Sequence, residues 1–198
     1  MDPDVVVLLV RHGRTALNAA GVLRGRLDPP LDDIGELEAR ALGEAFRGWR
    51  FTTVVTSPLH RARQTASAIV EAGHAHVEID IDLADRDYGP WAGSSLTEIN
   101  RQFGSIESAP GVEPMASFAS RVVAAVVSAS DRSAPDVVVV VAHDAVNRVV
   151  LSQLVPSLAQ SAELPQATGC WNRLERRGES WSAPVVGALP RVVGCDHG

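Results

Sequence analysis

At 198 residues, with 45% hydrophobic and 21% charged side chains, the chain has the size and composition of one domain with a substantial core, spanning residues 1–198. A formal net charge of −6 argues against a general nucleic-acid-binding surface, so any anion site has to be local. All 18 basic residues are arginines, which excludes chemistry that needs a lysine, such as pyridoxal Schiff bases, and leaves arginine to hold any phosphate.

The first apolar run, Val5 to Val10, lacks the basic flank and the cleavage site of a secretory signal. No apolar run approaches the length of a membrane span, so we expect a cytoplasmic protein without a membrane partner. Cys170 and Cys195 are too few for a disulfide framework and are not spaced as a metal pair. His74 and His76 could face one side of a strand as metal ligands, but no third ligand accompanies them, so we expect exposed histidines and no metal.

Three short, β-branched apolar runs are typical of strands that are buried on both faces of a parallel sheet, at residues 5–10, 52–56 and 137–142. Helical periodicity follows these runs, at residues 34–46, 62–70, 115–126 and 146–154. Strands that alternate with helices predict an α/β fold. The stretch at about residues 169–186 has the pattern of an edge hairpin.

Helix starts can be placed from capping residues. Asp32 or Asp33 can cap the first of these helices. Ser57 followed by Pro58 is typical of a cap with proline at the first helical position. Asp144 is expected to cap the helix that follows the third strand.

Histidines and arginines follow all three predicted strands. Arg11 and His12 end the first strand, Arg61 lies in the first turn after the second, and His143 ends the third. Because ligands bind beyond the carboxyl ends of parallel strands, these four side chains are expected to gather at one rim. A neutral imidazole can attack phosphorus, guanidinium groups can clamp phosphate oxygens, and a second imidazole can stabilise the transition state. The pattern therefore indicates phosphoryl transfer.

Several motifs in order carry a family resemblance. Residues 11–15 read Arg-His-Gly-Arg-Thr, residues 57–66 read Ser-Pro-Leu-His-Arg-Ala-Arg-Gln-Thr-Ala, and residues 141–143 read Val-Ala-His. With the Arg24-Gly25 loop between them, these motifs resemble the histidine phosphatase (phosphoglycerate mutase-like) superfamily over about residues 5–175.

This resemblance implies a three-layer α/β/α sandwich with a mainly parallel central sheet. It further implies that His12 is the phosphorylated nucleophile and that Arg11, Arg61 and His143 form the phosphate pocket. Asn18, Arg24, Gly25 and Asp144 are the expected substrate-binding residues. No metal or organic cofactor is expected.

The segment that carries the general acid departs from the family pattern. The family has a glutamate where this chain has Asp85, which is one methylene shorter. A misplacement near 1 Å can cost about 100-fold in rate, so the loop has to bring the shorter acid closer. Asp87 is the rival candidate; its alternative interpretation is a solvated or arginine-paired loop carboxylate beside Arg86.

Another departure follows the second histidine, where the family has glycine and this chain has Asp144. A carboxylate there would repel a phosphate dianion unless it turned inward as the helix cap, which is the prediction made above.

Three functions remain open at this point. The short segment between Gly93 and Pro114 leaves little room for a cover that excludes water, which favours a phosphatase acting on a small phosphorylated metabolite and releasing inorganic phosphate. The alternatives are a cofactor-dependent phosphoglycerate mutase and a weakly active phosphate-binding or scaffold protein. A homodimer is left open.

Overall fold

The computed structural model describes residues 2–71, 75–134, 136–161 and 164–190, and within these residues the strands form one six-stranded sheet. The strands are β1 (Val5–Arg11), β2 (Phe51–Thr56), β3 (His76–Ile79), β4 (Val137–Ala142), β5 (Trp171–Arg177) and β6 (Ser180–Ala188). Their order across the sheet is β3-β2-β4-β1-β5-β6. The first four run parallel, whereas β5 pairs antiparallel with both β1 and β6. The mainly parallel sheet is therefore confirmed, and β6 alone of the predicted hairpin is an edge strand.

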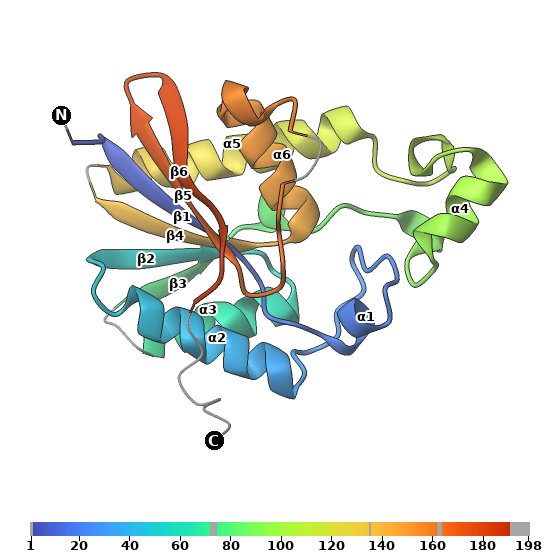
Figure 1. Cartoon of the computed structure of the whole chain (residues 1–198), viewed down its shortest axis with the longest axis horizontal. Coiled ribbons are helices and arrows are strands. Elements are labelled where there is room, and N and C mark those ends of the chain that lie inside the picture. The colour runs from blue at the N-terminus through green and yellow to red at the C-terminus, as the bar shows by residue number, and fades with distance from the viewer. Residues whose placement is uncertain (1, 72–74, 135, 162–163, 191–198) are drawn as a thin grey trace.

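Helices cover both faces of the sheet and complete the expected three layers (Figure 1). They are α1 (Ala16–Ala19), α2 (Asp33–Phe46), α3 (His60–Glu71), α4 (Leu96–Phe103), α5 (Met115–Ser133) and α6 (Asp144–Leu154), with short 3₁₀ helices η1 (Ile81–Leu83), η2 (Gly89–Trp91), η3 (Ile106–Ser108) and η4 (Pro156–Leu158). Figure 1 shows α2 and α3 on one face, α5 and α6 on the other, and α1 and α4 beyond the carboxyl ends of the strands. No helix within the described ranges is long and apolar enough to cross a membrane.

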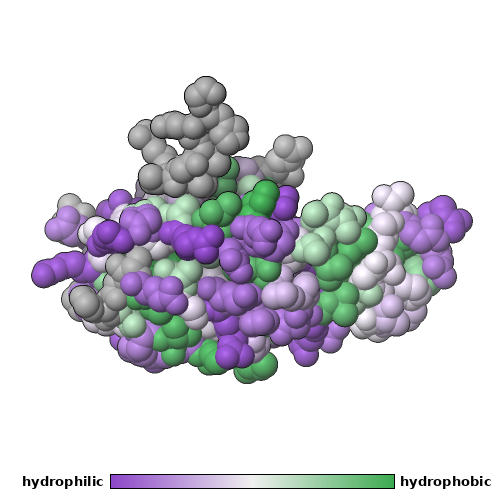
Figure 2. Space-filling model, turned by 90° about the horizontal axis from the view of Figure 1, so that it is seen from below, coloured by the Kyte–Doolittle hydropathy of each residue, from purple (hydrophilic) through white to green (hydrophobic). Residues whose placement is uncertain are grey.

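The core lies in two layers on either side of β1, whose residues are all buried. Val7 and Leu9 pack with α5 and α6, while Leu8 and Val10 pack with α2 and α3. Each such fully buried side chain stabilises the fold by about 1.5–3 kcal/mol. The outer face seen from below in Figure 2 is mainly hydrophilic with small, separate hydrophobic spots, as expected for exposed sides of amphipathic helices.

The predicted helix starts are confirmed in one case and shifted in another. Asp32 caps α2, because its carboxylate accepts a hydrogen bond from the Gly35 amide at 2.9 Å. Helix α3 begins at His60, two residues later than expected from Pro58. The reason is that Ser57, directly after β2, is still bonded to the neighbouring strand: its amide donates to the Val141 carbonyl of β4 at 3.0 Å.

The residues considered as thiols or metal ligands fall partly outside the described ranges, which exclude His74 and Cys195. Cys170 is a buried free thiol, and burial raises its pKa to about 12. His76 is exposed and lies 3.1 Å from Glu78. No group of three or more potential metal ligands occurs among the described side chains.

Candidate active site

The carboxyl ends of β1, β2 and β4 bring four of the sequence-predicted side chains together. His12 follows β1, Arg61 lies in the first turn of α3, and His143 follows β4; all three are fully buried. The imidazole rings of His12 and His143 lie 5.1 Å apart between centroids. Arg61 Nε donates a hydrogen bond to His12 Nε2 at 3.1 Å. Arg11 ends β1 beside them and is almost fully buried.

The tautomer of His12 is fixed by its own loop. Nδ1 lies 2.6 Å from the Gly13 carbonyl, which can only accept, so Nδ1 carries the hydrogen and Nε2 keeps its lone pair. Burial, reinforced by Arg61 and Arg11, holds the pKa of His12 well below its ordinary value. The imidazole is therefore neutral at neutral pH, with its lone pair on Nε2, where it accepts the hydrogen bond from Arg61.

Gly13 allows this loop to lie against the start of α2. A Cβ on Gly13 would meet the Gly35 carbonyl oxygen at 2.4 Å, and a Cβ on Gly35 would meet the Arg14 carbonyl oxygen at 2.0 Å. Both obstacles are backbone atoms, so a side chain at either position requires the chain to move. Gly13 is thus part of the sequence motif and is also required for the close packing of this loop against α2.

Arg61 is oriented by backbone carbonyls of the loop that contains Gly25. Its Nη1 donates to the Leu27 carbonyl at 2.7 Å and its Nη2 to the Gly25 carbonyl at 3.0 Å. Gly25 has φ +50°, and a Cβ there would meet the Arg86 carbonyl at 2.9 Å. The loop therefore fixes the guanidinium that contacts His12.

Three buried nitrogen atoms in this region have no hydrogen-bond partner among the described residues: Arg11 Nε, Arg24 Nε and His143 Nδ1. Arg11 bonds elsewhere to the Gln166 carbonyl. Ser57 Oγ accepts from the Leu59 amide at 3.3 Å and lies 2.7 Å from His143 Nε2; when the Ser57 hydroxyl donates to Nε2, the ring hydrogen of His143 is on Nδ1. Because an unpaired buried donor is costly, a set of three such donors indicates a place for an anion.

Asp85 lies at this pocket, and Asp87 does not. Asp85 is 4% exposed; its Oδ2 lies 3.2 Å from Arg61 Nη2 and 4.0 Å from His143 Nδ1. Burial raises the pKa of Asp85, although Arg61 and Arg24 oppose that shift. The Asp87 side chain is 40% exposed and pairs with Arg26 at 3.4 Å. The structure thus places Asp87 in a surface ion pair, with Arg26 rather than with Arg86.

Sequence reasoning missed the residue that holds the Asp85 segment. Arg121, on α5, donates to the carbonyls of Asp82 at 2.6 Å, Ala84 at 2.7 Å and Asp85 at 3.2 Å. It also forms two 2.8 Å bonds to the carboxylate of Glu113. These partners are 8 to 39 positions away in sequence, so no local pattern could have revealed them.

Asp144 does not cap α6, which corrects the sequence-based expectation. His143 occupies the N-cap position, and Asp144 is the first helical residue. Its carboxylate instead accepts a 2.8 Å hydrogen bond from Arg148, one turn further along the helix. The strand ends at Ala142 as expected, but α6 begins one residue earlier than a cap at Asp144 required, and the Asp144 side chain lines the mouth of the site.

Of the remaining predicted substrate-binding residues, Asn18 takes part in a helix cap, whereas Arg24 and Asp144 line a cavity. Asn18 forms a capping box with Thr15 at the start of α1, in which its Oδ1 accepts from the Thr15 amide at 3.0 Å. Arg24, Asp85, Tyr88 and Asp144 line a cavity of about 250 Å³ that opens beside the buried histidines. Burial raises the pKa of Tyr88 to about 12, so this phenol is a neutral hydrogen-bond donor.

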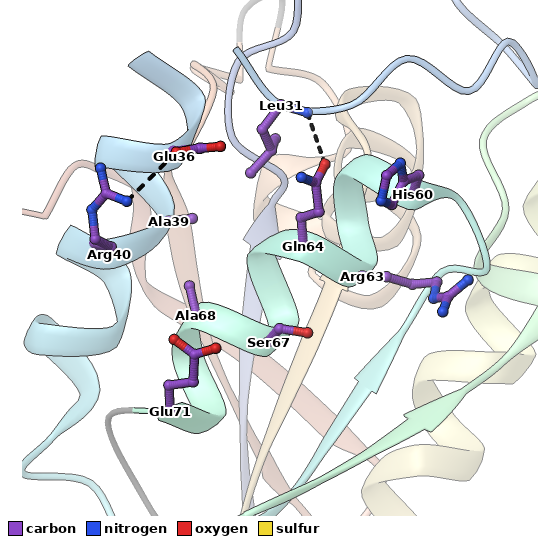
Figure 3. A pocket seen from close by; sticks show the side chains of 10 residues that line it. All are labelled: Leu31, Glu36, Ala39, Arg40, His60, Arg63, Gln64, Ser67, Ala68 and Glu71. Carbon is purple, nitrogen blue, oxygen red and sulfur yellow. Dashed lines mark hydrogen bonds and ion pairs between the residues drawn. The ribbon is translucent and has the colours of Figure 1, made fainter. Parts of the chain in front are cut away.

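A second hollow lies away from these residues, between α2 and α3, with a volume of about 340 Å³ (Figure 3). Several of its polar side chains already have partners in this chain: Arg40 pairs with Glu36 at 3.6 Å, and Gln64 accepts from the Leu31 backbone amide. The nucleophile candidate does not line this groove, which makes the mouth beside Asp85 the candidate active site.

Comparisons with known proteins concern the family and the fold of the chain. The model of the histidine phosphatase superfamily (branch 1) matches residues 7–188. The chain is 34% identical to the uncharacterized phosphatase PhoE of Bacillus subtilis, over 88% of this chain and 90% of that protein. It is 35% identical to a 2,3-bisphosphoglycerate-dependent phosphoglycerate mutase of Methylocella silvestris, over 51% of this chain and 52% of that protein. The structure of Bacillus stearothermophilus YhfR superimposes with a TM-score of 0.83 at 23% identity, over 93% and 98% of the two chains, which supports the fold.

Proposed function

Because the chain belongs to the histidine phosphatase superfamily, we propose that it is a phosphomonoester hydrolase that forms a phosphohistidine on His12. The observation that carries this proposal is the buried, neutral His12, whose Nε2 lone pair faces a guanidinium in a pocket with three unpartnered donors. A phosphate dianion supplies acceptors for those donors. The reaction then uses protein side chains and water.

In the first step, His12 Nε2 attacks phosphorus as the bond from phosphorus to the ester oxygen breaks. Arg11, Arg24 and Arg61 hold the non-bridging oxygens, and His143 Nδ1–H donates to the charge that develops there. Asp85 transfers its proton to the departing alkoxide. Burial raises the pKa of Asp85, which favours the protonated carboxyl group that this role needs.

In the second step, the Asp85 carboxylate takes a proton from water, and the resulting hydroxide attacks the phosphohistidine. The bond between His12 Nε2 and phosphorus breaks, inorganic phosphate leaves, and Asp85 is again protonated. The same residue therefore serves as acid and then as base, and the neutral imidazole is restored.

A mutase reaction is the second candidate, favoured by the likeness to a phosphoglycerate mutase over about half of each chain. The two reactions differ in whether water or a second substrate hydroxyl accepts the phosphoryl group. Between η2 and α5 the chain has only α4 and η3, which leaves little material to exclude water from the mouth. Formation of 2-phosphoglycerate from 3-phosphoglycerate, dependent on 2,3-bisphosphoglycerate, identifies the mutase; release of free phosphate identifies the phosphatase.

We also propose that residues 1–198 act as one domain in the cytoplasm on a small phosphorylated metabolite. A phosphate-binding scaffold is the third candidate, and it gives no turnover of p-nitrophenyl phosphate while still being stabilised by phosphate against heat. The homodimer stays a prediction for sedimentation analysis.

The direct test of the hydrolase proposal compares the protein with its His12→Ala variant on p-nitrophenyl phosphate. We expect turnover by the unmodified protein and its loss in His12→Ala, while thermal unfolding shows that the variant still folds. Appreciable residual turnover in a folded His12→Ala variant contradicts the proposal.

A further inference from the structure

The mouth of the site has an uneven charge distribution. Three arginines outside the cavity lining are already paired with carboxylates of this chain: Arg14 with Asp32 at 2.9 Å, Arg26 with Asp87 at 3.4 Å and Arg148 with Asp144 at 2.8 Å. Of the cavity-lining residues in the described part of the chain, only Arg24 is cationic, whereas Asp85 and Asp144 are acidic. The cavity that receives the leaving group is therefore not a general anion site.

Arg24 belongs to the phosphate end of this cavity. The carbonyl of the next residue, Gly25, accepts from Arg61 Nη2 at 3.0 Å, which ties this loop to the phosphate pocket. The pKa of His12 and of His143 is lowered mainly by burial, and the charge of Arg24 contributes to both shifts. Its buried Nε has no partner among the described residues. Phosphoryl oxygens on His12 satisfy that donor, which leaves no cation in the cavity for a second acidic group.

Asp144 lines the same cavity. It follows His143 directly at the start of α6, and its side chain remains 31% exposed despite the bond to Arg148. Its charge reaches the reacting groups: beyond burial, Asp144 contributes to the raised pKa of Asp85 and of Tyr88. Leu23 and Leu96 give the rest of the lining apolar contact for a carbon skeleton.

We propose that Asp144 determines substrate specificity at this site. The site selects phosphomonoesters whose alcohol carries neutral hydroxyl or ammonium groups near the ester oxygen, and it rejects esters with a second carboxylate or phosphate there. This inference rests on the proposed hydrolase function and names its substrate class. A carboxylate in the leaving group meets Asp144 at short range and finds no free cation in the cavity, whereas a hydroxyl or ammonium group can donate to Asp144.

The test uses two substrates that differ mainly in one group, glycerol 3-phosphate and 3-phosphoglycerate. We expect kcat/KM to favour glycerol 3-phosphate by about tenfold or more, the size expected for one partly screened like-charge contact. In Asp144→Asn that preference falls by about tenfold, because the isosteric amide removes the repulsion. In Arg148→Gln the preference grows, because Asp144 loses its neutralising partner.

Glu98→Gln is the matched control. Glu98 lies in the first turn of α4 and pairs with Arg101 on its own helix, as Asp144 pairs with Arg148, but it does not line the cavity. We expect the preference to stay unchanged in this variant. A wild-type preference for 3-phosphoglycerate, or the same preference in Asp144→Asn or in Arg148→Gln as in the wild type, overturns the inference. Turnover of p-nitrophenyl phosphate is measured alongside, and its absence from the wild type overturns the hydrolase function itself.

Discussion

Substitution of Arg121 tests how the segment that carries Asp85, the proposed general acid, is held in place. We expect Arg121→Lys to keep the positive charge but to lose the planar fork that contacts three carbonyls and both oxygens of Glu113. Because the two partners are mostly buried, at 17% and 14% exposure, the lost bonds destabilise the fold by about 3 kcal/mol. If the Asp85 segment shifts by about 1 Å, protonation of the leaving group slows by about 100-fold.

The assay compares kcat/KM for two esters in the same preparation, since kcat/KM covers the steps up to phosphohistidine formation. An alkyl phosphate needs its alkoxide protonated, whereas p-nitrophenolate leaves without an acid. We therefore expect Arg121→Lys to lower kcat/KM by about 100-fold for the alkyl ester and much less for the nitrophenyl ester. Arg132→Lys, at an exposed arginine on the same helix, is the control. An equal loss for both esters contradicts the positioning role, because it indicates general damage to the site.

Two further predictions follow from the buried ionisable groups. Asp85→Asn should lower kcat/KM for an alkyl phosphate by about 100-fold or more, while Asp87→Asn should change it less than about threefold; the reverse order would assign the acid to Asp87. Burial lowers the pKa of His12 and of His143 in the folded state. Below about pH 6.5 the unfolded chain therefore binds protons at these histidines that the folded chain does not bind, and the free energy of unfolding falls as the pH decreases. The thermal midpoint should therefore fall from pH 7.5 to pH 5.5, and the part of that fall due to the two rings should be smaller in His143→Gln; an identical fall in the variant contradicts this assignment.

The parts of the fold that the sequence predicts are those with strong local signals. β1 and β4 are buried runs and β2 is buried in its second half, all three rich in β-branched residues. Their carboxyl ends bring His12, Arg61 and His143 together as strand-end reasoning expects. β3 was not predicted because it is a short edge strand whose side chains are largely exposed, so it has no continuous apolar run.

The errors concern single-residue registers and long-range contacts. His143 takes the cap position expected for Asp144, because α6 begins one residue earlier than the capping pattern suggests. Ser57 was interpreted as a helix cap, yet its hydroxyl lies 2.7 Å from His143, which is 86 positions away. Arg121 likewise acts across 36 positions on Asp85. Contacts of this kind depend on tertiary packing, and no regular spacing of residues along the sequence predicts them.

The measurement that tests the central claim most directly is trapping of the covalent intermediate. The protein is mixed briefly with a 32P-labelled phosphomonoester, quenched in alkali and digested. We predict a label that is stable in alkali and lost in acid, confined to the peptide containing His12 and absent from His12→Ala. An acid-stable label, a label on another peptide, or turnover without any label on His12 contradicts the phosphohistidine mechanism.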